Sequence, residues 1–188
     1  MEELNNYAGE FRPHLRMQDF SKDALGRIWE LGGKLYIGLG TAYYRVLVER
    51  FGEQVASEVE RDVWRRWGLT EYRLNAEAMN ISGDDVATLF KVFQIDPASE
   101  ADGILNAEYD LKNNNHGIVT MRDCQTIKYF EKHGDIKFIE QSCGRICTDW
   151  YTQCAHFVNP KIEVINLKLP PRNSKEDIAC QREFRLVG

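Results

Sequence analysis

The spacing of apolar residues changes near residue 100, and this change limits the chain to one class of fold. Before it, apolar residues recur every three or four positions, as in Val55, Val59, Val63 and Trp67, which is the period of an amphipathic helix. After it, short apolar runs are bounded by Gly, Asn and Pro, which is typical of strands. The sequence therefore predicts an α+β fold, in which an N-terminal helical layer packs on a C-terminal antiparallel sheet with one longer helix.

Glycines and capping residues divide the N-terminal part into segments. Gly32-Gly33, Gly52 and Gly68 each follow an apolar helical pattern and are expected to end a helix. Asp96-Pro97 ends a further helix, because the residue before a proline disfavours helical geometry. The predicted helices cover residues 21–32, 34–51, 53–67, 71–79 and about 84–92, and residues 97–103 are predicted to form a polar loop.

The C-terminal part mixes strands and helices. Asn113 to Gly117 suits a hairpin turn, because Asn and Gly tolerate positive φ. Strands are predicted over residues 104–111, 117–122, 162–169 and 178–187, and helices over residues 124–132 and 140–157. With 188 residues, 43% of them hydrophobic, we expect one compact unit, made of an N-terminal extension (1–20), the helical layer (21–97) and a Cys-containing α+β part (98–188).

The charge pattern excludes two classes of partner. The formal net charge is -5, and the lysines and arginines are interspersed with carboxylates, so sequence-independent nucleic-acid binding is not expected. The most apolar stretch, Leu35 to Val48, is interrupted by Arg45 and is too short to cross a bilayer. The first twenty residues lack the pattern of a secretory signal. We therefore expect a soluble cytoplasmic protein that binds neither nucleic acid nor membrane.

Five cysteines, all between Cys124 and Cys180, are the strongest indication of chemistry. In a reducing compartment such thiols are free, metal-bound or catalytic rather than paired in disulfides. The spacing Cys143-x3-Cys147-x6-Cys154 predicts that these three lie along one stripe of a helix.

Three interpretations of the thiols stay open. Cys124, Cys143 and Cys180, with Cys147 as a fourth ligand, would hold zinc or an iron–sulfur cluster, because thiolates select such soft metals. Alternatively, Cys124 acts as a nucleophile, because it begins a helix whose dipole favours the thiolate. The bases available to it are His116, His133 and His156. The third interpretation is that the thiols pack as small buried hydrophobes.

The helix predicted over 34–51 offers a second candidate site. Small and aromatic residues alternate there, which predicts either a cavity beside the sheet with tyrosine hydroxyls as its polar contacts, or tight packing between helices. The residues concerned are Gly33, Gly38, Gly40, Tyr36, Tyr43 and Tyr44. By contrast, Glu58, Glu60 and Asp62 are expected on a solvated helix face. Glu71, beside Arg73, is expected to form a buried ion pair that holds the helical layer on the sheet.

Several separated residues carry a family resemblance. In the helical part these are Trp29, Tyr36, Tyr43-Tyr44, Glu49-Arg50-Phe51-Gly52, Val63-Trp64, Glu71, Asn80-Ile81 and Asp96-Pro97, and in the rest they are Cys124, Cys143, Asn159-Pro160, Pro170-Pro171, and Cys180 before Phe184. This order resembles a family of uncharacterised prokaryotic cytosolic proteins. From about Cys124 onward it is also similar to 4-vinyl-reductase-like small-molecule-binding domains and to proteins named as L-2-amino-thiazoline-4-carboxylic acid hydrolases. The resemblance implies an α+β pocket protein that binds a small molecule, a metal or both.

Two functions follow from these observations. The first is an intracellular protein that binds a small molecule, a metal or both in a thiol-lined pocket between the helical layer and the sheet. The second is a hydrolase that acts on a small heterocyclic substrate with a metal-activated water or a thiol nucleophile. A third interpretation, a purely structural role in a homodimer, is compatible with the helical face.

Overall fold

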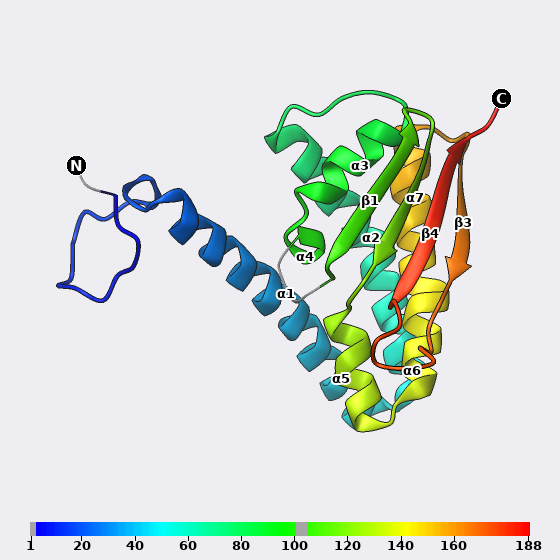
Figure 1. Ribbon diagram of the computed structural model, residues 1–188. Helices are drawn as coiled ribbons and strands as arrows, with labels where there is room; N and C mark the ends of the chain where they lie inside the picture. The colour runs from blue at the N-terminus through cyan, green and yellow to red at the C-terminus, as the bar shows by residue number, and fades with distance from the viewer. Residues whose placement is uncertain (1–2, 101–104) are drawn as a thin grey trace.

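The fold is α+β, as predicted, and its centre is a four-stranded antiparallel sheet (Figure 1). The computed structural model describes residues 3–100 and 105–188. The strand order is β1 (Ala107–Asn113), β2 (His116–Met121), β4 (Cys180–Leu186) and β3 (Ile162–Lys168). The first two strands form the predicted hairpin, and β4 lies between β2 and β3.

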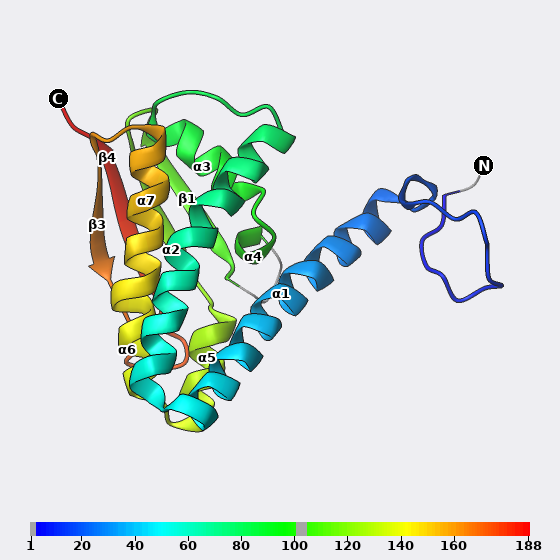
Figure 2. The same cartoon turned by 180° about the vertical axis from the view of Figure 1, so that it is seen from behind.

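Helices cover one face of this sheet. In the view from behind, α2 and α7 lie side by side in front of the strands (Figure 2). The helices in chain order are α1 (Lys22–Phe51), α2 (Glu53–Ala78), α3 (Val86–Gln94), α4 (Pro97–Glu100), α5 (Gln125–His133), α6 (Ile136–Gln141) and α7 (Thr148–Val158). A short 3-10 turn (Met17–Asp19) precedes α1, and a π-helical turn (Ser142–Cys147) joins α6 to α7.

Strand alternation determines which residues of β4 enter the core. Cys180, Arg182 and Phe184 point toward the helices and are buried, because side chains two apart on a strand share a face. Phe184 packs edge-on against Phe90 of α3, with ring centroids 5.4 Å apart. Gly117 of β2 is paired with Phe184, and a Cβ at Gly117 would lie 2.5 Å from the Phe90 ring. The glycine is thus required for α3 to approach the sheet.

Two predicted helix ends are wrong. The chain continues as one helix through Gly32-Gly33 and again through Gly68, so four predicted helices are two long ones. At Gly68 the reason is packing, since a Cβ there would lie 2.1 Å from the indole Cδ1 of Trp150 on α7. Gly52 does end α1, with a φ of 83°. Part of the predicted 97–103 loop is the short helix α4, and the rest of that loop, from residue 101, and the predicted strand start at residue 104 lie outside the described residues.

The N-terminal half of α1 extends away from the rest of the fold (Figures 1 and 2). Its first turn is capped by Ser21, whose Oγ accepts from the Ala24 N–H at 3.2 Å. The preceding segment folds back on this end, and the Leu4 N–H donates to the Asp19 carbonyl at 2.9 Å. Among the described helices, none combines the length and apolar content that a bilayer span requires.

Candidate functional site

A cavity of about 170 Å³ lies between the two long helices and the start of the C-terminal part. Its walls are mostly aromatic and aliphatic, with carboxylates and thiols among them. The lining residues are Tyr36, Ile37, Gly40, Thr41, Glu60, Trp64, Glu71, Asp96, Ala98, Leu105, Cys124, Thr126, Phe130, Phe138, Ser142, Cys143, Ile146, Cys147, Trp150 and Tyr151. A mostly apolar cavity with a few polar groups is the usual form of a small-molecule site.

Three of the five cysteines line this cavity. Cys124 comes from the N-terminus of α5, whereas Cys143 and Cys147 come from the π-helical turn. Such turns insert an extra residue into a helix and are frequent at functional sites. Cys154, which was predicted to share their stripe, is fully buried in the core and does not line the cavity. The irregular turn was not visible in the sequence pattern, which assumed a regular helix.

Arg182 brings a buried positive charge to the thiols. It is 3% exposed, and its Nη1 donates to Cys180 Sγ at 2.9 Å while its Nη2 donates to the Cys143 carbonyl at 3.3 Å. Its guanidinium also lies over the Tyr151 ring, 4.6 Å from the centroid. Among the described residues no ion pair includes Arg182. A buried charge without a counter-charge costs free energy, so a thiolate near the Arg182 guanidinium stabilises the buried arginine.

Cys147 is the thiol that this environment ionises most easily. A hydrogen bond donated by Cys143, together with the charge of Arg182, lowers the pKa of Cys147 to about 7 although burial opposes the shift. Burial raises the pKa of Cys124 to about 12 and also raises that of Cys180. Cys124 therefore lines the cavity as a neutral thiol at neutral pH, and Cys147 is the cavity thiol whose pKa is lowered.

Carboxyl groups occupy the helical side of the cavity. Burial, and to a smaller extent the charge of Cys147, raises the pKa of Glu60 to about 7. The pKa of Glu71 rises to about 8, first through burial and then through the neighbouring charge of Asp96. Glu71 accepts a long hydrogen bond of 3.5 Å from the Tyr36 hydroxyl. The predicted ion pair of Glu71 with Arg73 is not formed, because Arg73 points outward and pairs with Glu77.

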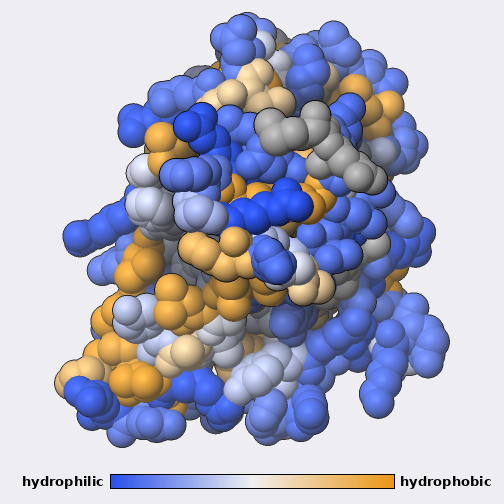
Figure 3. Space-filling model, turned by 90° about the vertical axis from the view of Figure 1, so that its left-hand side faces the viewer, coloured by the Kyte–Doolittle hydropathy of each residue, from blue (hydrophilic) through white to orange (hydrophobic). Residues whose placement is uncertain are grey.

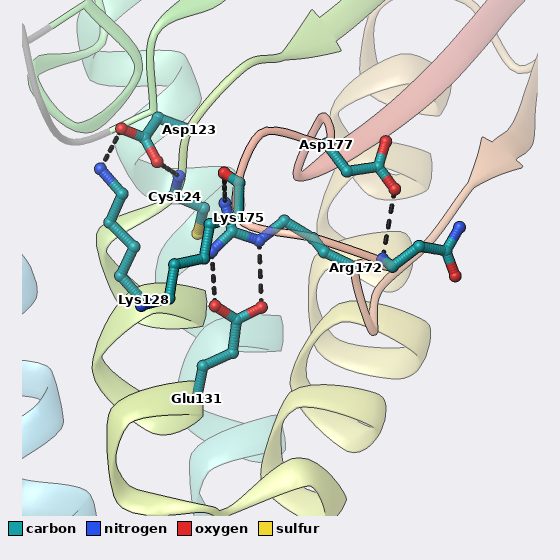
Figure 4. Close-up of polar contacts among 8 residues, drawn as sticks. Asp123, Cys124, Lys128, Glu131, Arg172, Lys175 and Asp177 are labelled. Carbon is teal, nitrogen blue, oxygen red and sulfur yellow. Dashed lines mark hydrogen bonds and ion pairs between the residues drawn. The ribbon is translucent and has the colours of Figure 1, made fainter.

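A set of polar contacts holds the β3–β4 connection over Cys124 (Figure 4). Arg172 of this connection forms a two-pronged ion pair with Glu131 of α5 and donates to the Lys175 carbonyl at 3.2 Å. Asp123, just before α5, accepts from the Cys124 N–H at 3.1 Å and pairs with Lys128. These contacts fix the start of α5, and with it the position of the Cys124 thiol.

The structure brings only part of the predicted tyrosine and histidine sets to the cavity. Tyr36 lines it, whereas Tyr43 is 66% exposed and Tyr44 is buried in the core. The cavity also has no histidine among its described lining residues. His116 bonds Glu183 at 2.7 Å on the outer face of the sheet, His133 bonds the Tyr129 carbonyl at 2.7 Å, and His156 is exposed on α7.

Sequence reasoning missed two residues of the site. Glu60 was expected on a solvated face, but its Oε2 atom is buried beside the cavity. Arg182 was not considered at all. The signal for Arg182 was present, because Cys180, Arg182 and Phe184 alternate along a strand and therefore share one face.

The predicted metal ligands lie in one region but do not form a metal-binding group. Cys124, Cys143, Cys147 and Cys180 are close enough to influence one another's ionisation. In the part of the chain that the structure describes, no three His, Cys, Asp or Glu side chains converge as a metal ion requires. The Arg182 guanidinium at Cys180 also supplies the positive charge that a metal would bring. Zinc or an iron–sulfur cluster at these thiols therefore stays a prediction.

Comparisons of the chain with protein-family models, with curated proteins and with solved structures found no match. The family resemblance drawn from separated residues therefore stays a prediction. The cavity and the residues that line it are therefore the basis for the function proposed below.

Proposed function

We propose that this protein binds a small organic molecule in the cavity between α1, α2 and the π-helical turn. The observation that supports the proposal is the combination of mostly apolar walls with thiols and carboxyl groups among them. Binding sites for small molecules typically have such walls, with a few polar groups that orient the ligand. The size of the cavity suits a compact ligand.

Two glycines of α1 provide a matched test. Gly40 lines the cavity, whereas Gly38 does not, and a Cβ at either position meets nothing within 4 Å. Gly40→Leu should therefore fill the cavity without disturbing the helix, and Gly38→Leu adds the same side chain outside it. Compounds found in a fragment screen should lose binding at least tenfold in Gly40→Leu and retain it in Gly38→Leu. Equal binding to both variants would place the ligand elsewhere.

A second candidate function, thiol-dependent hydrolysis of a small heterocycle, is favoured by one observation. Cys147 and Glu60 line the same cavity, and the pKa of each is near 7. A thiol and a carboxyl group with similar proton affinity can act as nucleophile and acid–base partner at neutral pH.

The step uses these residues as follows. The Cys147 thiolate attacks the electrophilic ring carbon, a C–S bond forms, the ring C–N bond breaks, and the nitrogen takes the proton held by Glu60. Glu60 then accepts a proton from water as the oxygen adds to the carbon. The C–S bond breaks, which restores the thiolate and protonated Glu60. The net change is the addition of one water to the substrate.

The covalent intermediate makes this candidate testable. With a panel of cyclic amides, mass spectrometry should detect an adduct on Cys147 that is lost in Cys147→Ser. Cys154→Ser, which changes a core thiol outside the cavity, should retain the adduct. Turnover that persists in Cys147→Ser would contradict the thiol mechanism.

The predicted zinc or iron–sulfur cofactor requires its own measurement. Elemental analysis and a visible spectrum of protein purified without oxygen would detect it. Stoichiometric metal that is lost in Cys143→Ser would show that the thiols rearrange around an ion.

A further inference from the structure

We propose that the end of the cavity formed by Tyr36, Trp64 and Glu71 binds the positively charged group of the ligand, an ammonium, amidinium or guanidinium. This inference rests on the proposed function, since it names the class of molecule that the cavity takes.

The first support is the imbalance of charge along the cavity wall. Glu60, Glu71 and Asp96 line it, and no Lys, Arg or His is among its described lining residues. Neither Glu60 nor Glu71 takes part in an ion pair within the described ranges. Carboxyl groups that are removed from water without a counter-charge attract a cation strongly.

The second support is the geometry at Glu71. Among the described residues, its side chain accepts one hydrogen bond, from the Tyr36 hydroxyl, at the long distance of 3.5 Å. Asp96 beside it accepts from the Ala98 N–H at 2.8 Å and from Asn75 Nδ2 at 3.4 Å. Burial and the charge of Asp96 raise the Glu71 pKa to about 8. A bound cation would offset the burial of Glu71 and the charge of Asp96, and it would donate further hydrogen bonds to Glu71.

The third support is the aromatic lining of this end. The rings of Tyr36 and Trp64 meet edge to face, with centroids 6.1 Å apart. Aromatic faces attract organic cations by about 0.5–2 kcal/mol each, more strongly when water is excluded. Two buried atoms elsewhere in the lining, Glu60 Oε2 and Trp150 Nε1, also lack a partner. A ligand with its own donors and acceptors would satisfy them.

The position of the cation sets the orientation of the ligand in the cavity. Glu60 and Glu71 are eleven residues apart on the same face of α2, which corresponds to about 16 Å along the helix axis. The charge of Cys147 contributes to the raised pKa of Glu60, so Glu60 lies near the thiols. The charge of Asp96 contributes to the raised pKa of Glu71, so Glu71 lies near Asp96. A molecule with its charged group at Glu71 would therefore point its other end toward the thiols.

Matched pairs of cationic and neutral molecules test this inference. Phenethylamine is compared with 2-phenylethanol, and benzamidine with benzamide, because each pair has nearly the same shape and differs in charge. Affinities are measured by calorimetry for the wild type, for Glu71→Gln, and for Glu77→Gln as a control on the exposed side of α2. We expect each cation to bind at least tenfold more tightly than its neutral partner, and this preference to be lost in Glu71→Gln alone.

Two other results of these binding measurements would contradict the inference. Neutral molecules that bind as well as the cations, or a cation preference that survives in Glu71→Gln, would overturn the charge assignment and leave the cavity as a binding site. No binding by either pair, together with no effect of Gly40→Leu on any fragment, would overturn the proposed function as well.

A separate observation concerns the outer side of α1, which we infer to be the contact between two copies of this chain. Exposed apolar residues recur there at helical spacing over most of the helix. They are Ile28, Leu31, Leu35, Leu39, Tyr43 and Val46, each between 41% and 66% exposed. At about 100° per residue they occupy a single stripe, opposite the buried Gly33 and Tyr44. We call this set the outer stripe.

A helix at the surface normally has a polar outer face, so the apolar outer stripe is expected to pack against another protein surface. Hydrophobic residues lie exposed among hydrophilic ones on the side of the molecule that Figure 3 shows. With Trp29 beside it, the stripe exposes on the order of 500 Å², at about 100 Å² per aliphatic and about 200 Å² per aromatic side chain. A stable interface of about 800 Å² per partner contains about 450 Å² of apolar area. A second copy, offering the same stripe, matches this requirement.

Light scattering during size-exclusion chromatography tests the dimer. The wild type at micromolar concentration should have twice the mass of one chain. Leu35→Glu with Leu39→Glu should give the mass of one chain with the helical circular dichroism retained, whereas the control Lys34→Glu, off the stripe, should remain dimeric. A wild type with the mass of one chain, or a double variant that stays dimeric, would overturn the inference.

Discussion

Replacing Cys143 with Ala or Ser separates the hydrogen bond at Cys147 from the other influences on that thiol. The S–H of Cys143 donates to Cys147 and is the largest cause of the low Cys147 pKa. Cys143→Ala removes this donor, whereas Cys143→Ser retains one in the same place. The charge of Arg182 stays in both variants, since its bond to residue 143 uses the backbone carbonyl.

The expected size of the effect follows from the two pKa values. At pH 7, a thiol with a pKa of about 7 is about half ionised, whereas one with the ordinary pKa of 9.0 is about 1% ionised. If the hydrogen bond supplies between one and two units of this difference, Cys143→Ala lowers the thiolate fraction at pH 7 by roughly 5- to 50-fold. Each unit corresponds to about 1.4 kcal/mol.

The assay is the pH dependence of the alkylation of Cys147 by iodoacetamide, followed by peptide mapping. The midpoint should move upward by at least one unit in Cys143→Ala and by much less in Cys143→Ser, and the rates should converge at high pH. Cys154→Ala serves as the control for loss of a buried thiol. An unchanged midpoint in Cys143→Ala would refute the assigned role of the hydrogen bond.

Two further predictions concern packing and pH. Gly68→Ala should lower the free energy of unfolding by about 1–3 kcal/mol, measured by urea denaturation, because its Cβ would meet Trp150 at 2.1 Å, and an unaffected stability would contradict the close packing. Glu71 has a folded pKa of about 8, raised from 4.5, so the folded state binds the extra proton and loses stability as pH rises between these values. Thermal unfolding of Glu71→Gln should therefore show a weaker decline between pH 5 and 8, by on the order of 2 kcal/mol, and identical pH profiles would count against a buried Glu71.

The fold class was predictable because periodicity reports which face of an element is buried. The sheet, the hairpin and the longer helix before β3 were all found in this way. Helix ends were not, because the glycines at 32, 33 and 68 are compatible both with a helix end and with a continuous helix. At Gly68, the deciding contact is with Trp150, more than eighty residues further along the chain, and no local pattern contains it.

The site was predictable in its composition but not in its roles. Cys124, Cys143 and Tyr36 line the cavity as expected. The π-helical turn, however, determines that Cys147 rather than Cys154 faces the cavity, and a regular helical wheel cannot show this. The ionisation of Cys147 depends on Arg182, which reaches it from a different element. Such convergence is a property of the tertiary fold.

The most direct test of the account is the order in which the five cysteines react with a substoichiometric amount of iodoacetamide at pH 7. Cys147 should be labelled first, because it lines the cavity and its pKa is about 7. Cys124 and Cys180 should follow much more slowly, because burial raises their pKa values. Labelling that begins at Cys124 or Cys180, or that reaches Cys147 only after denaturation, would contradict the account.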